Sequence, residues 1–399
     1  MSTIPNPSVA HAGSAQALRY YTAVTVTFFA ASAVPTPLYR LYQEAWHFSP
    51  ATLTVVFGVY AIGLLLALLF TGSLSDHVGR RPVILGAIAL DCLSLMSFIV
   101  SNDAWLLMAS RALQGLATGA GASALGAAML DADRHRGPLN KSVAPLAGMG
   151  LGSLAGGVLA VFAPQPLKLP YVLLLIVFAI QAVLMRAIPE TVTPRPFSAR
   201  VIHPRIRIPS AARNAMLLVA PVNVAAWALN GFYLSLGPSL ARNVTGSESL
   251  MVGGLVVAAL IGGAMVAVML LRKREASHLL TGGSIMLSVG VAMTLAGIDV
   301  KGLVLFFAGT VLAGCGVGMV FQSALRTLLP LAAAEERGGL MAAFYVVSYL
   351  AFCIPAVIAG VVVNFVGIDA TAAGYGTALL LLALSTGFRN ALRSGKPAS

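Results

Sequence analysis

Long apolar runs recur along almost the whole chain and are separated by short polar segments. Each run is about 20 residues long, the length that an α-helix needs to cross the ~30 Å hydrocarbon core of a bilayer. Inside a bilayer the backbone must satisfy its own hydrogen bonds, so unbroken runs predict helices and not the short alternating strands of a membrane barrel. The runs lie at residues 22–40, 51–73, 82–101, 104–128, 141–163, 170–188, 213–238, 249–271, 278–297, 302–327, 338–363 and 370–388.

This pattern predicts an all-α membrane protein with twelve transmembrane helices in two six-helix bundles. The segment between the bundles, residues 189–209, is rich in proline and arginine, a composition that favours an open backbone. The expected parts are a tail over 1–20, an N-terminal bundle over 21–188, a linker over 189–212, a C-terminal bundle over 213–390 and a tail over 391–399.

Lysine and arginine fall unevenly on the two sides that this arrangement defines. Of the 25 Lys and Arg residues, 20 lie on the side of both termini, four (Arg40, Lys168, Arg242 and Lys301) lie on the opposite side, and Arg111 lies inside a run. Cytoplasmic loops carry an excess of Lys and Arg, so we predict cytoplasmic termini in a bacterial inner membrane. Because the net charge of +12 is spread over these loops, it indicates topology and not nucleic-acid binding.

Composition excludes a soluble domain and supports no bound cofactor. Hydrophobic residues make up 58% of the chain and charged residues 10%, against about 25% charged in a soluble domain. Cys92, Cys315 and Cys353 fall inside apolar runs and show no disulfide or metal-ligand spacing. No phosphate-binding glycine loop, zinc-protease or serine-hydrolase motif occurs. We expect no metal, no cofactor and no enzyme activity, and we expect a monomer surrounded by lipid.

The segment between the second and third runs carries the most diagnostic motif. Glycines there permit a tight turn between packed helices, and Asp76 can pair with Arg80 or cap the positive end of a neighbouring helix. Contacts of this kind can favour one of two conformations. The segment reads Gly72-Ser-Leu-Ser-Asp76-His77-Val-Gly79-Arg80-Arg81. It resembles the signature of the major facilitator superfamily of secondary transporters, from which it departs at His77, where Arg or Lys is usual.

Two ionisable residues inside the runs are the candidates for proton coupling. Arg111 lies about two turns inside the fourth run and, with Gln114 and Gly115, matches the superfamily's Arg-x-x-Gln-Gly pattern. An arginine inside a span costs about 2.5 kcal/mol or more, so it should have a partner. Asp91 is the one carboxylate clearly inside any run. We expect Asp91 and Arg111 to pair, either to link protonation of Asp91 to movement or as a static pair that fixes packing.

The fifth run is rich in glycine. It contains Gly148-Met-Gly-Leu-Gly152-Ser153-Leu-Ala-Gly156-Gly157. This segment resembles the glycine-rich antiporter motif of drug and metabolite exporters, with Ser153 in place of its usual proline. Small residues three or four apart also let helices approach closely, so packing alone can account for the glycines. The motif therefore favours export only slightly.

Polar and aromatic side chains in the second half indicate a substrate cavity. Residues at i, i+4 and i+7 share one helical face. The alternative for each is a role in interhelical packing or in an interfacial belt. The candidates are Asn223, Trp227 and Asn230 in the seventh run, Gln322 and Arg326 in the tenth, and Tyr345 and Tyr349 in the eleventh.

The resemblance implies a cavity between the bundles that opens alternately to each side. The first hypothesis is proton-coupled export of a small amphipathic compound or metabolite, with Asp91 as proton carrier and Arg111 as its modulator. The absence of an acid from the first run weakens a cationic drug as substrate. The second hypothesis is import by proton symport through the same machinery. A membrane-embedded receptor or enzyme, the third, would bind or convert a ligand without moving it across the membrane.

Overall fold

The protein is helical in the residues that the computed structural model describes, which are 7–192, 206–333 and 335–394. The N-terminal half contains α1 (Pro7–Ala33), α2 (Pro35–Trp46), α3 (Pro50–Thr71), α4 (Leu74–Val78), α5 (Arg80–Val100), α6 (Ala104–Ala132), α7 (Gly137–Phe162) and α8 (Leu169–Leu184), the last with a 3-10 turn (Met185–Ala187). The C-terminal half contains α9 (Ser210–Ser235), α10 (Gly237–Thr245), α11 (Leu250–Leu270), α12 (Ala276–Asp299), α13 (Leu303–Leu328), a 3-10 turn (Leu329–Leu331) and α14 (Arg337–Ser394). The middle of the predicted linker, 193–205, and the outer ends of the predicted tails lie outside the described residues.

The predicted all-α fold class is confirmed. In the described part of the chain, nine helices are long and apolar enough to span a bilayer: α3, α5, α7, α8 with its 3-10 turn, α9, α11, α12, α13 and α14. α14 is two helices, because Gly367 has a non-helical φ of 79°. Adding α1 and α6, which pack against these helices, gives a helix for each of the twelve apolar runs.

We expected the first apolar run to form one continuous helix, but the structure breaks it between α1 and α2. α1 ends at Ala33 and α2 begins at Pro35, which has no N–H and so leaves the carbonyl of Ala31 without its helical donor. The C-terminal half repeats this arrangement, since α9 ends at Ser235 and Pro238 lies in the first turn of α10. Each half therefore begins with a helix that breaks near the same side, as expected of a parallel structural repeat.

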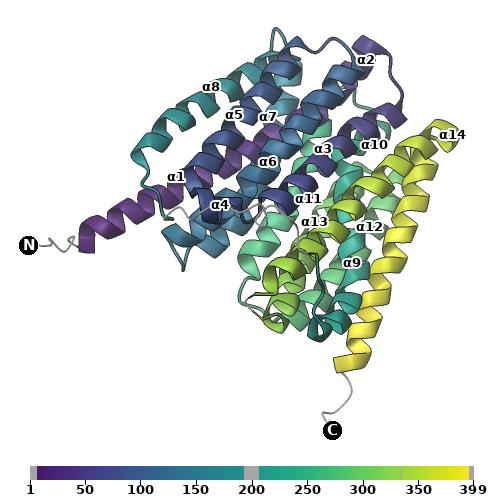
Figure 1. The fold of residues 1–399 in the computed structure, drawn as a ribbon. Coiled ribbons are helices and arrows are strands. Elements are labelled where there is room, and N and C mark those ends of the chain that lie inside the picture. Colours follow the sequence, from purple (N-terminus) through teal and green to yellow (C-terminus); the bar gives the residue numbers. More distant parts are fainter. Residues whose placement is uncertain (1–6, 193–205, 334, 395–399) are drawn as a thin grey trace, which may run out of the picture.

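Each half packs around its own hydrophobic core. One buried cluster extends from Ala17 to Ile188. The other extends from Ala212 to Ala383 and takes in Phe57 and Ala61 of α3. Figure 1 shows the two halves side by side, with helices that converge at the end carrying α2 and α10 and diverge toward the chain termini. We call the end with the termini the terminal side and the other end the opposite side.

The halves meet along α7 with α11 and along α3 with α14. On the opposite side, a Cβ added to Gly254 of α11 would lie only 2.4 Å from the carbonyl oxygen of Ser153 in α7. The Ser153 hydroxyl donates a hydrogen bond to the Gly254 carbonyl at 3.1 Å. Farther toward the terminal side, a Cβ on Gly150 would meet its nearest neighbour, Ile261, only at 3.9 Å. The backbones of the two halves therefore touch at Gly254 on the opposite side, contact one turn later is by side chains, and the helices diverge toward the terminal side (Figure 1).

Candidate transport site and conformational motif

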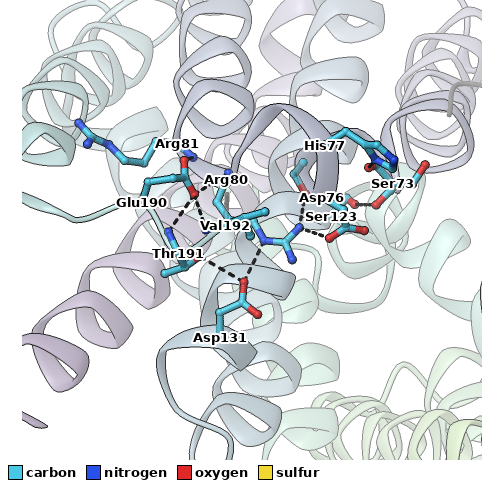
Figure 2. A network of polar contacts seen from close by, with 12 residues as sticks. Ser73, Asp76, His77, Arg80, Arg81, Ser123, Asp131, Glu190, Thr191 and Val192 are labelled. Atoms are coloured by element: carbon cyan, nitrogen blue, oxygen red, sulfur yellow. Dashed lines mark hydrogen bonds and ion pairs between the residues drawn. The ribbon is translucent and has the colours of Figure 1, made fainter. Parts of the chain in front are cut away.

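The glycine-aspartate-arginine motif folds into a compact polar network (Figure 2). α4 ends at Val78, and the next residue, Gly79, has a φ of 107°, in a region that glycine adopts readily and other residues rarely do. The turn directs Arg80, the first residue of α5, back toward α4. There its Nη1 lies 2.5 Å from Oδ1 of Asp76. Of the two roles that the sequence allows for Asp76, the structure has the ion pair with Arg80.

Two residues that the sequence analysis did not select complete this network. Asp131, near the end of α6, accepts a hydrogen bond from Nε of Arg80 at 2.9 Å. Glu190 accepts from the backbone N–H groups of Arg80 and Arg81, each at 2.9 Å (Figure 2). These are the first free N–H groups of α5, so Glu190 occupies the anion site that a helix N-terminus offers. Glu190 could have been noticed in the sequence as an acidic residue two positions after the sixth apolar run, at the start of an arginine-rich segment.

The network also holds Glu190 in its charged form. Partial burial raises the pKa of the Glu190 carboxyl, but four backbone hydrogen bonds, led by those from Arg81 and Arg80, outweigh it and the net pKa lies below its usual value. The Thr191 hydroxyl donates to Oδ2 of Asp131 at 3.2 Å. The motif thus joins α4, α5 and α6 to the start of the segment that leads to the other half.

The interior of the N-terminal half holds the two candidate coupling residues. Asp91 of α5 is 0% exposed and Arg111 of α6 is 1% exposed. The ion pairs of the described residues do not include one between them, so the expected direct pairing is wrong for this conformation. Both carboxylate oxygens of Asp91 lack a hydrogen-bond partner among the described residues.

The break between α1 and α2 explains the contacts of Arg111 and Gln114, the polar residues of the Arg-x-x-Gln-Gly pattern on α6. The carbonyl of Ala31 has no helical donor because Pro35 follows four residues later. Gln114 replaces that donor, since its Nε2 lies 3.0 Å from the Ala31 oxygen. An unpaired carbonyl buried in a bundle is costly, so this amide stabilises the broken helix.

Arg111 completes the same arrangement. Its Nη1 donates to the Ser32 carbonyl at 3.0 Å and to Oε1 of Gln114 at 2.6 Å. Its guanidinium lies over the ring of Tyr60 in α3, 4.2 Å from the centroid, which adds a cation–π contact. Arg111 is therefore held by α1, α3 and its own helix, and Asp91 is left without a direct partner.

The motif glycines of α6 and α7 lie where helix backbones come into contact. A Cβ on Gly115 would lie 2.2 Å from a carbonyl oxygen of α3, and one on Gly152 would lie 2.2 Å from a carbonyl oxygen of α1. A Cβ on Gly156 would lie 2.6 Å from the carbonyl oxygen of Val34, between α1 and α2, whereas one on Gly157 would lie 3.3 Å from a Cα atom of α11 in the other half. Close packing therefore requires glycine at the first three positions, which accounts for them without reference to transport direction.

An aromatic cluster in the C-terminal half borders the N-terminal half. The rings of Trp227 and Tyr349 lie 4.9 Å apart. Phe352 lies 4.8 Å from Phe57 of α3, across the boundary between the halves. The tryptophan and the two tyrosines were predicted from the sequence. The phenylalanines were not, because the hydrophobic pattern does not distinguish them from other apolar residues of a helix. The cluster consists of Trp227, Phe321, Tyr345, Tyr349 and Phe352.

The two asparagines predicted on α9 form hydrogen bonds with residues of the C-terminal half. Asn223 is buried and donates from Nδ2 to Oγ of Ser348 in α14 at 2.9 Å. Asn230 donates to the carbonyl of Ala226 in its own helix at 2.9 Å. Both lie on the helix that carries Trp227, and the amide oxygen of Asn223 has no partner among the described residues.

The structure does not group the two residues selected on α13 with the aromatic cluster. Gln322 donates from Nε2 to the carbonyl of Val268 in α11 at 2.7 Å. Arg326 is exposed on the terminal side, where it donates to the carbonyls of Arg272 and Arg274 in the loop after α11. The carbonyls of that loop hold the guanidinium apart from the aromatic cluster, and a role of Arg326 in the substrate cavity stays a prediction.

The sequence model described as the Major Facilitator Superfamily matches residues 21–356 of the 399. The chain belongs to the major facilitator superfamily. This transporter is a multi-pass membrane protein and not an enzyme.

Two solved transporter structures share this fold. The nucleoside transporter NupG superposes with a TM-score of 0.74 and 10% identity, over 93% of this chain and 98% of that one. The human organic anion transporter MFSD10 (TETRAN) superposes with a TM-score of 0.68 and 18% identity, over 94% and 99%. At these identities the similarity shows the fold alone.

Curated relatives match over a short stretch. Multidrug resistance protein D of Escherichia coli K12 is 38% identical over 66 residues, which is 16% of this chain and 17% of the relative. Multidrug resistance protein MdtL of Escherichia coli O139:H28 is 37% identical over 71 residues, 18% of each chain. The chain thus spans less than a fifth of the length of these curated relatives.

Proposed function

We propose that this transporter exports a small amphipathic compound or metabolite in exchange for protons, by alternating access across a bacterial inner membrane with both termini in the cytoplasm. The observation that carries the proposal is Asp91, a fully buried carboxylate that forms no ion pair in the described structure. A charge at that depth is costly, and one bound proton removes it. Binding and release of a proton at Asp91 therefore changes the forces between α5 and its neighbours.

Arg111 is the group through which that change reaches the rest of the bundle. It is the buried cation of the adjacent helix, and it is tied to α1 and α3 through Ser32 and Tyr60. When Asp91 is charged it attracts Arg111 away from these contacts, and when Asp91 is neutral the contacts keep the guanidinium. The two states favour different positions of α6 relative to α1 and α3.

Direction and substrate class follow from three further observations. The distribution of Lys and Arg supports a cytoplasmic terminal side, and the helices of the two halves diverge toward that side, from which an exporter would load. The aromatic cluster offers large apolar faces with hydroxyl and indole groups, which suits an amphipathic compound. The curated relatives with a matching stretch carry the name multidrug resistance protein.

The test is flux in sealed proteoliposomes driven by a pH gradient, with a panel of dyes, antibiotics and organic acids. We compare the wild type, Asp91→Asn and the matched control Asp299→Asn, which removes a carboxylate from an exposed position at the end of α12. We expect gradient-driven flux in the wild type and the control, and at least a 10-fold loss in Asp91→Asn.

Undiminished gradient-driven flux in Asp91→Asn would refute Asp91 as the proton carrier. Movement of substrate in the same direction as protons would replace export by import through symport.

A further inference from the structure

A carboxylate on the opposite side binds guanidinium groups from both halves. Glu248 lies in the segment between α10 and α11, and its Oε2 is 2.5 Å from Nη2 of Arg40 in α2. Nη1 of Arg40 also donates to the Glu248 backbone carbonyl at 3.1 Å. Of the ion pairs in the described part of the chain, this is the one that joins the N-terminal half to the C-terminal half.

Each member of this pair has a second partner within its own half. Nε of Arg40 lies 2.6 Å from Oε1 of Glu44, one turn later in α2. Oε1 of Glu248 lies 2.7 Å from Nη2 of Arg242 in α10. When the halves separate on this side, the Arg40–Glu248 contact is lost but neither charge is left alone. The arrangement therefore lowers the free energy needed to part the halves.

The pair closes a place where side-chain packing between the halves is incomplete. A cavity of about 150 Å³ is lined by Arg40 and by further residues of both halves, including Thr36 and Gln43 of the N-terminal half and Ser235 and Ser249 of the C-terminal half. The ion pair bridges this space at the surface, with 27% of the Arg40 side chain and 65% of the Glu248 side chain exposed. An exposed pair of this kind changes an equilibrium by about 1.5- to 5-fold, which suits a contact that must break in every cycle.

We propose that Arg40 and Glu248 form a latch that holds the opposite side closed, and that Glu44 and Arg242 receive the two charges when it opens. The latch rests on the proposed function only in requiring that the halves part on this side. The latch predicts that removing a charge of the Arg40–Glu248 pair and removing a charge of their second partners shift the balance between open and closed states in opposite directions. Removing Arg40 or Glu248 removes the latch and favours opening. Removing Glu44 or Arg242 leaves one charge of the open state without a partner and so favours closure.

The test measures the distance between spin labels on the opposite side of the two halves in lipid nanodiscs. Labels are placed on cysteines at Asn102 and Val300, which are exposed and lie outside the latch, in a chain whose three native cysteines are replaced by alanine. We expect Arg40→Gln and Glu248→Gln to raise the ratio of long to short distances by about 1.5- to 5-fold. We expect Glu44→Gln and Arg242→Gln to lower the ratio.

A matched control and a double variant make the outcome decisive. Lys168→Gln removes a positive charge from the same side without touching the latch and should leave the ratio unchanged. The double variant Arg40→Gln/Glu248→Gln should shift the ratio no further than either single variant, because both remove the same contact. Where the open population is too small to resolve by the distance measurement, a second assay reports the same equilibrium. It measures the alkylation rate of a cysteine placed at Ser235, which is buried and lines the cavity.

Shifts in the same direction for all four single variants, or shifts no larger than that of Lys168→Gln, overturn the latch. Neither readout needs a substrate or a proton gradient. The latch can therefore fail while proton-coupled export stands, and the flux assay can fail while the latch stands.

Discussion

Replacing Glu190 tests whether the acid after α8 stabilises the conformational motif. Glu190→Ala removes the acceptor of two backbone N–H groups at the start of α5. Loss of a helix cap costs about 1 kcal/mol, and loss of a negative charge beside a helix N-terminus costs about 0.3–1 kcal/mol more. We therefore expect Glu190→Ala to lower the free energy of unfolding by about 1–2 kcal/mol. Glu190→Gln keeps an acceptor oxygen and should lose about half as much.

The assay is thermal unfolding of the purified transporter in detergent, followed by tryptophan fluorescence. For a chain of this length, 1–2 kcal/mol corresponds to a fall in Tm of about 1–3 °C. The control is Glu275→Gln, an exposed carboxyl in the loop between α11 and α12 that lies 3.8 Å from Nδ1 of His278. We expect a fall in Tm in the order Glu190→Ala, Glu190→Gln and Glu275→Gln, with the last close to zero.

The pH dependence supplies a second check. The pKa of Glu190 is lowered in the folded protein, so its stabilising effect is present above its usual value of 4.5 and is lost as the pH falls through the lowered pKa. The difference in Tm between the wild type and Glu190→Gln should therefore be full at pH 7 and should close as the pH falls below 4.5. Equal falls in Tm for the three variants, or a difference that does not change with pH, would refute the capping role.

Two further substitutions test the interior of each half. Gln114→Leu leaves the Ala31 carbonyl without a donor and Arg111 without one acceptor, so it should cost about 1–3 kcal/mol of stability in the same unfolding assay. The control Ser142→Ala, at a half-buried site on α7, removes a hydroxyl that donates to a carbonyl of its own helix and should cost much less. Trp227→Ala removes the central ring of the aromatic cluster, so it should raise the half-saturating concentration of an amphipathic substrate about 10-fold in the flux assay; an unchanged concentration would exclude the cluster from binding.

Much of the fold could be predicted from the sequence because the bilayer imposes one length and one polarity on every span. Each of the twelve apolar runs corresponds to a helix. What hydropathy could not give was the break after Ala33, because the apolar run continues through Pro35 without a charged residue. It also missed that α1 begins as early as Pro7, since a helix can extend beyond the hydrocarbon layer with polar side chains.

The site was predictable where its contacts are local in sequence. Asp76 and Arg80 are four residues apart, on either side of the turn at Gly79, so their ion pair could be anticipated from the closeness in sequence. Glu190 binds the same segment from 110 residues away, and spacing carries no such information. The expected pairing of Asp91 with Arg111 was wrong because the sequence offered two candidates for the guanidinium, a carboxylate and the carbonyls freed by a proline. The choice between them depends on how α1 and α6 are placed in space.

The two halves repeat one architecture but not one chemistry, and α3 connects their different interiors. Among the described residues, the buried charged side chains Asp91 and Arg111 lie in the N-terminal half, whereas the aromatic cluster around Trp227 lies in the C-terminal half. α3 carries Tyr60, whose ring lies under Arg111, and Phe57, whose ring contacts Phe352 of the aromatic cluster. These two residues are three positions apart and therefore on neighbouring parts of one helix surface. Any displacement of α3 changes the surroundings of Arg111 and of the aromatic cluster together, so this helix physically connects the buried charges of one half to the aromatic cluster of the other.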